Sequence, residues 1–97
     1  MNKYTVVVIL EAKPGKEPAL KQALSNVIKP SRSETTCIEY RLHQDHNNPA
    51  QFVLFENWKN KEAHQAQFDK PYIQALAQQI DGLLAKPYQA FCMQELE

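Results

Sequence analysis

The sequence predicts one small α+β domain of the ferredoxin-like kind, an antiparallel sheet with helices on one face that pairs into a dimeric α+β barrel. Alternating and β-branched segments predict four strands, and apolar stripes at helical spacing predict helices between them, in the order β-α-β-β-α-β. The first strand, residues 3–12, contains the run Val6–Leu10, which is apolar on both faces. The helices of a 97-residue domain cover only one face, so we expect a homodimer to cover the other.

The first helix is expected to follow a turn at Lys13-Pro14-Gly15 and to run from about Glu17 to residue 29. An extension of this helix to Ser33 stays open. Pro30 has no N–H to donate, so it is expected to end or kink the helix. Apolar residues recur at helical spacing and form one stripe, which consists of Ala19, Leu20, Ala23, Leu24, Val27 and Ile28.

Two strands joined by a hairpin follow, at residues 36–44 and 51–58, with turn residues at 45–49 between them. Successive side chains of a strand alternate between its two faces. In the first of these strands, we expect one face to carry Cys37, Glu39, Arg41 and His43, and the other Ile38, Tyr40 and Leu42. In the second, we expect Phe52, Leu54, Glu56 and Trp58 opposite Val53, Phe55 and Asn57.

The last helical region is predicted in two parts. Asn60 is a plausible N-cap for the first part, and the sequence Asp69-Lys70-Pro71 interrupts the pattern. A second helix opens at Pro71 and stops at Asp81-Gly82. Its inner stripe consists of Ile73, Leu76, Ala77 and Ile80. A fourth strand is predicted at residues 87–95, with Tyr88, Ala90 and Cys92 opposite Phe91 and Met93.

Charge and targeting signals narrow the class of protein. The 11 Lys and Arg residues balance the 11 Asp and Glu residues, whereas a dedicated nucleic-acid binder needs a basic excess or stripe. No stretch approaches transmembrane length, and the apolar run near the N-terminus is too short for a signal peptide. The sequence therefore predicts a cytoplasmic, single domain over residues 1–97 that has neither a nucleic acid nor a membrane as partner.

The two cysteines, Cys37 and Cys92, have neither metal-ligand spacing nor C-x-x-C spacing. We expect them to be small buried side chains rather than reactive thiols. In the usual strand order of this fold, their strands form the two edges of the sheet, which places them about 14 Å apart. A disulfide needs a Cα separation below about 7 Å, so we expect none within a chain.

Short motifs between residues 32 and 72 carry a family resemblance. Arg32 and Glu34 precede Cys37 in an Arg-x-Glu-x-x-Cys run, with Tyr40 three residues later. The hairpin and third strand then supply Asn48, Pro49, Phe52, Glu56 and Trp58, and the next helix begins with Glu62 and Ala63. In these motifs the sequence resembles the antibiotic biosynthesis monooxygenase family, which includes quinol monooxygenase-like members.

The resemblance implies a cofactor-independent monooxygenase that acts on a small aromatic or quinol-type substrate in a pocket between sheet and helices. The substrate would supply the electrons, and the protein would deprotonate a phenolic group in a dry cavity. It also implies a homodimer. We expect no cofactor, because the sequence lacks a Gly-rich phosphate loop. None of the three histidines has metal-ligand spacing to another, so we expect no metal site.

Three positions depart from the family pattern. Gln67 stands nine residues after Trp58, where the family has a His, and Tyr72 replaces a His that follows Pro. The antibiotic-oxidising members have an Asn at the position of Leu54. These departures keep open an alternative, a non-catalytic small-molecule-binding or regulatory dimeric α+β barrel module. Haem binding is a third hypothesis, which Gln67-Phe68 disfavours because an axial ligand there would be His.

Glu56 is the most informative candidate for catalysis. It lies among apolar side chains of the same strand face, where burying an unpaired carboxylate is costly. We expect either an ion pair with Arg41 or Arg32, or a pocket acid or base with a raised pKa. Trp58 and Phe52 on that face are expected as aromatic walls for a flat substrate, or as ordinary core aromatics.

Further candidates lie on the helices after the third strand. By the resemblance, Gln67 and Tyr72 are expected as hydrogen-bond partners of the substrate, although Tyr72 fits equally well as a packed aromatic. His64 and Gln67 share one helical face, so His64 is either a relocated proton acceptor or a solvated surface residue. Together the candidates comprise Glu56, Trp58 and Gln67 for catalysis, and Phe52, Leu54, His64, Tyr72 and Arg41 for substrate binding.

Overall fold

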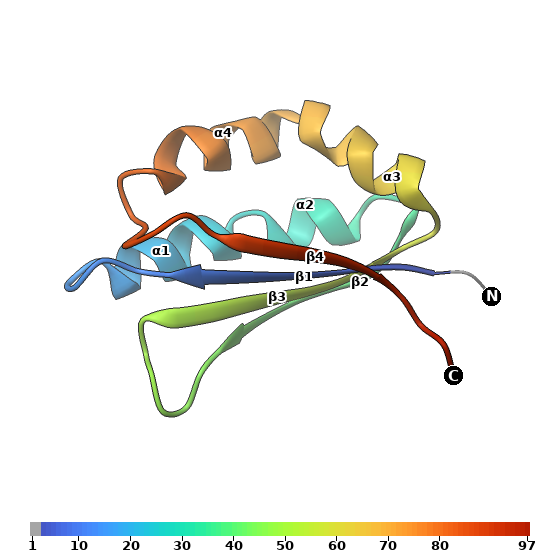
Figure 1. Cartoon of the computed structure of the whole chain (residues 1–97). Helices are drawn as coiled ribbons and strands as arrows, with labels where there is room; N and C mark the ends of the chain where they lie inside the picture. The colour runs from blue at the N-terminus through green and yellow to red at the C-terminus, as the bar shows by residue number, and fades with distance from the viewer. Residues whose placement is uncertain (1–2) are drawn as a thin grey trace.

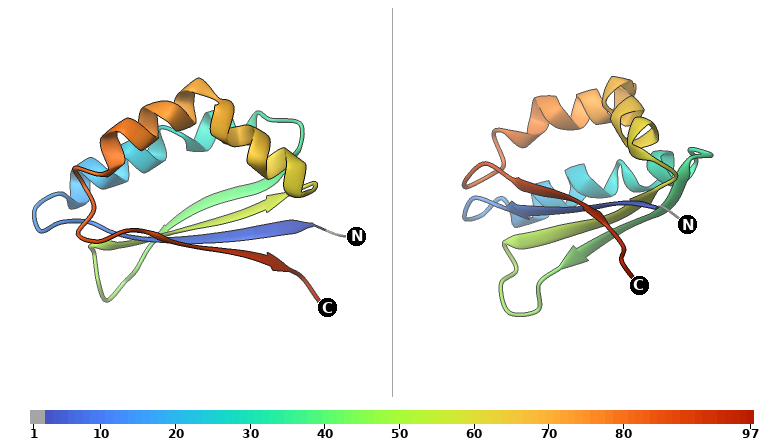
Figure 2. Two further views of the ribbon diagram at one scale, coloured as in Figure 1. Left: turned by 45° about the horizontal axis from the view of Figure 1, so that its top comes forward. Right: turned by 45° about the vertical axis from the view of Figure 1, so that its right-hand side comes forward.

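Four antiparallel strands form one sheet in the order β2-β3-β1-β4 (Figure 1). The computed structural model describes residues 3–97. The strands are β1 (Tyr4–Glu11), β2 (Cys37–Gln44), β3 (Gln51–Trp58) and β4 (Gln89–Gln94). All helices lie on one face of this sheet (Figure 2). The predicted α+β, ferredoxin-like arrangement is therefore confirmed, with the second and fourth strands at the edges.

The helices above the sheet fall into two successive groups along the chain. The first group is α1 (Glu17–Ser25) and α2 (Ile28–Arg32). The second comprises α3 (Lys61–Ala66), a 3₁₀ turn η1 (Gln67–Asp69) and α4 (Pro71–Ile80). Among residues 3–97, no helix combines the length and the apolar composition that crossing a membrane requires.

Pro30 breaks the first helical region upstream of itself. The helix is interrupted at Asn26 and Val27, and α2 then continues through Arg32. A proline clashes with the carbonyl of the residue four positions earlier, which here is Asn26, and cannot donate to it. Pro30 itself lies in the first turn of α2, where an N–H has no partner within the helix. The continuous helix expected from Glu17 to residue 29 is therefore wrong, because it is broken at Asn26 and Val27, while helical structure does extend past Pro30 to Arg32.

Local capping fixes where α3 and α4 begin. The Asn60 side-chain oxygen accepts a hydrogen bond of 2.8 Å from the backbone N–H of Ala63, which confirms the predicted N-cap. Pro71 is the first residue of α4, as predicted. The tighter η1 turn between the two helices directs Gln67 toward the sheet, where its exposure is only 4%.

A β-bulge changes the expected faces of β2. Its register is irregular between Cys37 and Glu39, because Ile38 is an extra residue relative to β3. Cys37 pairs with Trp58 and packs against the core, while Ile38 is 52% exposed. The prediction that Cys37 shares a face with Glu39, and Ile38 with Tyr40, is therefore wrong. An inserted residue reverses the alternation at that point.

The main core lies between the inner face of the sheet and the helices. Side chains buried there include Val6, Leu10, Leu20, Leu24, Val27, Tyr40, Phe52 and Trp58. The opposite face of the sheet also carries apolar side chains, contributed by Val7, Ile9, Val53, Phe55, Phe91 and Met93. Among the residues that the structure describes, 3–97, no helix covers that face (Figure 2).

Both cysteines are free. They lie on the two edge strands of the sheet, which confirms the expectation that they do not form an intrachain disulfide. Burial raises the pKa of the Cys37 thiol to about 11, so it stays protonated at neutral pH. Cys92 is exposed, and the expectation of a buried side chain is wrong for it. As an edge strand, β4 lacks neighbours that would cover it on its open side.

Candidate functional site

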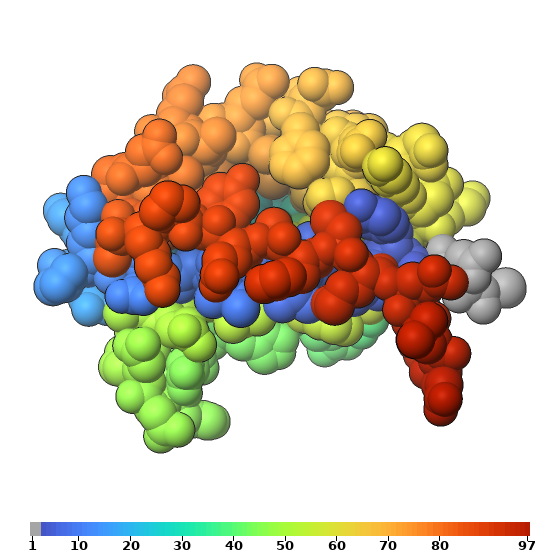
Figure 3. All heavy atoms as spheres, in the orientation of Figure 1, coloured from blue at the N-terminus to red at the C-terminus, as the bar shows by residue number. Residues whose placement is uncertain are grey.

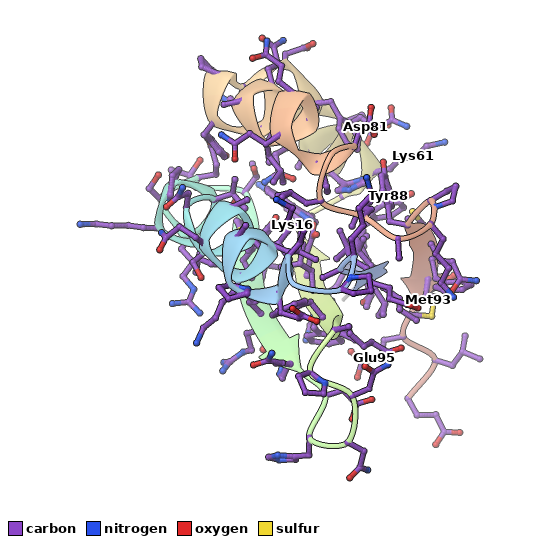
Figure 4. The ribbon with its side chains drawn as sticks, turned by 90° about the vertical axis from the view of Figure 1, so that its left-hand side faces the viewer. Lys16, Lys61, Asp81, Tyr88, Met93 and Glu95 are labelled. Carbon is purple, nitrogen blue, oxygen red and sulfur yellow. The ribbon has the colours of Figure 1, made fainter. Side chains whose placement is uncertain are left out.

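A cavity of about 180 Å³ lies between the inner face of the sheet and the helices. Its walls are mainly aliphatic side chains from β1, β3 and α4. The polar and aromatic side chains at the cavity are Tyr40, Glu56, His64, Gln67, Phe68 and Tyr88. The molecular surface is hollowed between β4 and the α3–α4 segment (Figure 3). Tyr88 lies between α4 and β4, where the cavity opens (Figure 4).

Glu56 presents its carboxyl group to this cavity from β3. The side chain is 3% exposed, and its Oε1 accepts a 2.9 Å hydrogen bond from the indole N–H of Trp58. Residues two apart on a strand share a face, which places the indole beside the carboxyl group. Burial raises the pKa of Glu56 to about 7, and the Trp58 hydrogen bond partly opposes that rise. Near neutral pH, Glu56 can therefore both release and accept a proton.

Neither expected arginine pairs with Glu56. Arg41 contacts Glu39 at 3.3 Å and pairs across the sheet with Phe55, so it lies on the outer face. The Nε of Arg32 donates to the carbonyl oxygen of Tyr40 instead. The predicted ion pair is wrong because Tyr40, and not Arg41, stands opposite Glu56. For the same reason Arg41 does not reach the cavity, and we withdraw its expected part in substrate binding.

His64 is the nearest ionisable neighbour of Glu56 at the cavity. Its Nε2 lies 4.0 Å from Oε1 of Glu56, and the residue is only 9% exposed, which excludes a solvated surface histidine. Three aromatic rings surround the imidazole, those of Tyr4, Trp58 and Phe68, with centroids 5.6, 6.0 and 5.1 Å away. Burial lowers the pKa of His64, so the ring is neutral at pH 7.

Gln67 and Tyr72 belong to a second polar group above the cavity. The Gln67 amide donates a 2.9 Å hydrogen bond to the hydroxyl of Ser31, which is fully buried on α2. The Tyr72 hydroxyl donates to Oε2 of Glu34 at 3.1 Å. Gln67 lines the cavity, whereas Tyr72 does not. Gln67 is thus held in place by the helix beneath it.

The sequence profile of one protein family matches most of the chain, including the residues of β3 and α3 at this site. The sequence profile of the antibiotic biosynthesis monooxygenase family matches residues 3–79. The chain belongs to this family. An uncharacterised protein of Synechocystis, sll1783, is 35% identical over 78 residues, which are 80% of this chain and 53% of that protein. The chain therefore spans about half the length of that relative.

Solved structures show the same architecture as this family member. Protein PA3566 of Pseudomonas aeruginosa is similar with a TM-score of 0.95 at 25% identity, over 100% of this chain and 97% of that one. Protein Rv0793 of Mycobacterium tuberculosis has a TM-score of 0.93 at 24% identity, over 98% of this chain and 96% of that one. At 24% identity, the second likeness shows the fold alone.

The structure brings half of the expected site residues together in this antibiotic biosynthesis monooxygenase domain. Leu54, Glu56, His64 and Gln67 line the cavity. Phe52 and Trp58 are each 1% exposed and lie outside the lining, so they are core aromatics rather than walls. Trp58 still acts on the site through its hydrogen bond to Glu56.

Sequence reasoning missed three aromatic residues at the cavity. Tyr40 shares the inner face of β2 with the cavity, a signal that alternation did supply, whereas Tyr88 immediately precedes β4. Phe68 follows Gln67 in η1 and is 53% exposed at the opening. Within residues 3–97, no cluster of three or more His, Cys, Asp or Glu side chains is placed to hold a metal ion.

Proposed function

We propose that the protein is a cofactor-independent monooxygenase that acts on a small aromatic or quinol-type substrate in this cavity. One observation carries the proposal: Glu56 is a buried carboxyl group with a pKa of about 7 in an otherwise apolar pocket. A general base works best when its pKa lies near the working pH. Membership of the antibiotic biosynthesis monooxygenase family supports the same reaction class.

The reaction needs no reductant besides the substrate. A quinol and O₂ give a hydroxyquinone and water, so the substrate loses four electrons and the two oxygen atoms gain four. Glu56 takes the proton of a phenolic hydroxyl, and the resulting anion is a much stronger electron donor to O₂ than the neutral phenol. The apolar walls exclude water from that anion. Leu54 forms part of those walls, and the Gln67 amide lies within the same cavity as a hydrogen-bonding group.

The size and charge of the cavity restrict the substrate. Its volume of about 180 Å³ is below the roughly 300–1,000 Å³ of pockets for drug-sized ligands. Among residues 3–97, no lysine or arginine side chain lines it. We therefore propose a neutral molecule of one or two rings, since a carboxylated substrate would bring an uncompensated charge into an apolar site.

A panel of one-ring and two-ring quinols tests this proposal by oxygen consumption of the purified protein. We expect uptake above the rate without protein, with a preference for neutral quinols over carboxylated ones. If clear quinol binding comes with no oxygen uptake, the proposed reaction is excluded. That outcome would favour a non-catalytic binding module. The family pattern has a histidine at the position of Gln67, whose amide nitrogen donates to Ser31, and this difference supports the alternative.

We also propose that two copies pair through the outer faces of their sheets. Phe91 and Met93 are 45% and 44% exposed there, beside the half-buried Val7, Val53 and Phe55. Contiguous apolar surface of this kind marks an interaction site. A second copy satisfies it at a two-fold axis, because the same patch then serves both partners.

Light scattering at micromolar concentration is expected to give the mass of a dimer, and Phe55→Asp is expected to give a monomer. The aspartate would place a charge in the centre of the shared face, where it has no partner. Ala75→Asp on the exposed side of α4 is the matched control and should leave the dimer intact. A monomeric wild-type protein would contradict the proposed pairing.

A further inference from the structure

The geometry points to a specific place for the substrate's hydroxyl group. We propose that its oxygen binds between Oε1 of Glu56 and Nε2 of His64, and that His64 is a second catalytic residue, which donates a hydrogen bond to the phenolate as it forms. This inference rests on the proposed function, since it assigns the substrate's position within the same cavity. It adds a residue that departs from the family pattern, in which the histidine stands at the position of Gln67.

The separation of the two atoms is the first argument. At 4.0 Å they are too far apart for a direct hydrogen bond. One oxygen atom about 2.8 Å from each would satisfy both, with an angle of roughly 90° at that oxygen. Oε1 already accepts from Trp58, but a carboxylate oxygen has a second lone pair for a further donor. The pair therefore fits a single bridging hydroxyl group.

The rigidity of the pair is the second argument. Trp58 holds Glu56 from the same strand, and the ring of His64 packs among Tyr4, Trp58 and Phe68. The Asn60 cap fixes the start of α3, one turn before His64. Groups held in place before the substrate arrives do not need to reorganise during the reaction, which is what makes such sites effective.

Proton and charge balance give the third argument. The ionised Glu56 accepts the phenolic proton, so one negative charge passes from the carboxylate to the substrate oxygen and none is created. The neutral imidazole of His64 donates its Nε2–H to that oxygen throughout. The phenolate then receives two hydrogen bonds, one from the protonated Glu56 and one from His64. Both stabilise charge where it develops.

The other ionisable groups around the pair stay neutral over the working range. Tyr40 on β2 stands opposite Glu56, and burial raises the pKa of its hydroxyl well above the usual value. Cys37 on the same strand has a pKa of about 11. Tyr4 on β1 packs against His64 with its ring tilted, and the pKa of Tyr4 is also raised, chiefly by a hydrogen bond with Cys92. Titration near neutral pH at this place is therefore that of Glu56, beside a neutral His64.

The test compares 1-naphthol with its methyl ether, 1-methoxynaphthalene, by calorimetric binding at pH 8. The two ligands share the ring system, but only naphthol has a proton to give. We expect wild type to bind naphthol at least 10-fold more tightly than the ether. His64→Phe keeps an aromatic ring in the cluster but has no N–H. The affinity of this variant for naphthol should therefore fall to its affinity for the ether, and its affinity for the ether should equal that of wild type.

Two further variants protect this test. His64→Gln retains an N–H donor and should keep part of the preference for naphthol, even if the ring packing suffers. His46→Phe, in the exposed hairpin turn, is the control and should leave both affinities as in wild type. Equal affinities of wild type for naphthol and the ether would overturn the proposal. An equal loss of affinity for naphthol and for the ether in His64→Phe would also overturn the proposal.

The same variants separate this inference from the proposed function. With a quinol substrate, His64→Phe should lower kcat by about 10²-fold, as expected for the loss of one donor to a developing oxyanion. Naphthol preference that depends on His64, without oxygen uptake from any quinol, would support the binding position and refute the oxygenase. Oxygen uptake that is equal in wild type and His64→Phe would support the oxygenase and refute the role of His64.

Discussion

Replacing Glu56 by Gln is expected to lower the rate of quinol oxygenation by about 10²–10⁴-fold, which is the usual contribution of a general base. The amide side chain of the Glu56→Gln variant still offers an oxygen to the indole of Trp58, so the strand and the core should be unaffected. That amide cannot accept the phenolic proton. The measurement is steady-state oxygen consumption with the best quinol of the panel, at a pH of about 8, where Glu56 is ionised.

The control for this substitution is Glu62→Gln. Glu62 lies in the first turn of α3 near the site but is exposed, so the same change of charge is made outside the cavity. Its rate should match that of wild type. Equal rates for wild type and the Glu56 variant would remove Glu56 from the mechanism, whatever the cavity binds.

The effect of Glu56→Gln on the free energy of unfolding is expected to depend on pH. Relative to wild type, the variant should be about 3 kcal/mol more stable at neutral and alkaline pH than it is in acid. The pKa of Glu56 rises from 4.5 to about 7 on folding, and each pKa unit corresponds to about 1.4 kcal/mol. The folded state therefore binds this proton more tightly than the unfolded state. The stabilisation that the folded state gains from this proton is fully present below about pH 4.5 and is lost as the pH rises to about 7.

Urea unfolding of wild type and Glu56→Gln at several pH values between 4.5 and 8 measures this effect. The difference between the two proteins isolates Glu56, because the titration of most other groups is common to both. We expect the free energy of unfolding of the variant, relative to that of wild type, to rise steadily up to about pH 7. A difference that does not change with pH would mean that Glu56 ionises in the folded state as easily as in water. A gain in stability with a loss of rate is the usual pattern for a residue held in a costly position for function.

The inward face of β3 could be predicted from the sequence because side-chain alternation is a local property of a strand. It placed Leu54 and Glu56 on one face with Trp58, and all three lie on the inner face. The hydrogen bond from Trp58 to Glu56 follows from the same two-residue spacing, whereas charge complementarity favours an arginine as the partner. The prediction of Arg41 as that partner rested on charge alone, because the register between β2 and β3 is not visible in the sequence. In the structure Tyr40 pairs with Glu56, so the neighbouring Arg41 lies on the opposite face of the sheet.

The position of His64 could not be predicted in the same way. Helical spacing relates it to Gln67, but its burial depends on how α3 packs against the beginning of β1 and the end of β3. Tyr4 and Trp58 are neighbours only because those strands pair antiparallel over their full length. The bulge at Ile38 is likewise a property of two paired strands, so one strand read alone places Cys37 on the wrong face.

Isotope labelling tests the central claim, that this cavity oxygenates a quinol without a cofactor, most directly. The purified protein reacts with a two-ring quinol under ¹⁸O₂, with a chelator present and no flavin or metal added. The mass of the product is then measured by mass spectrometry. We predict one ¹⁸O atom in each hydroxyquinone, formed faster than without protein and at a rate that falls in Glu56→Gln. A product without ¹⁸O, or one formed equally fast without protein, would contradict the proposed function.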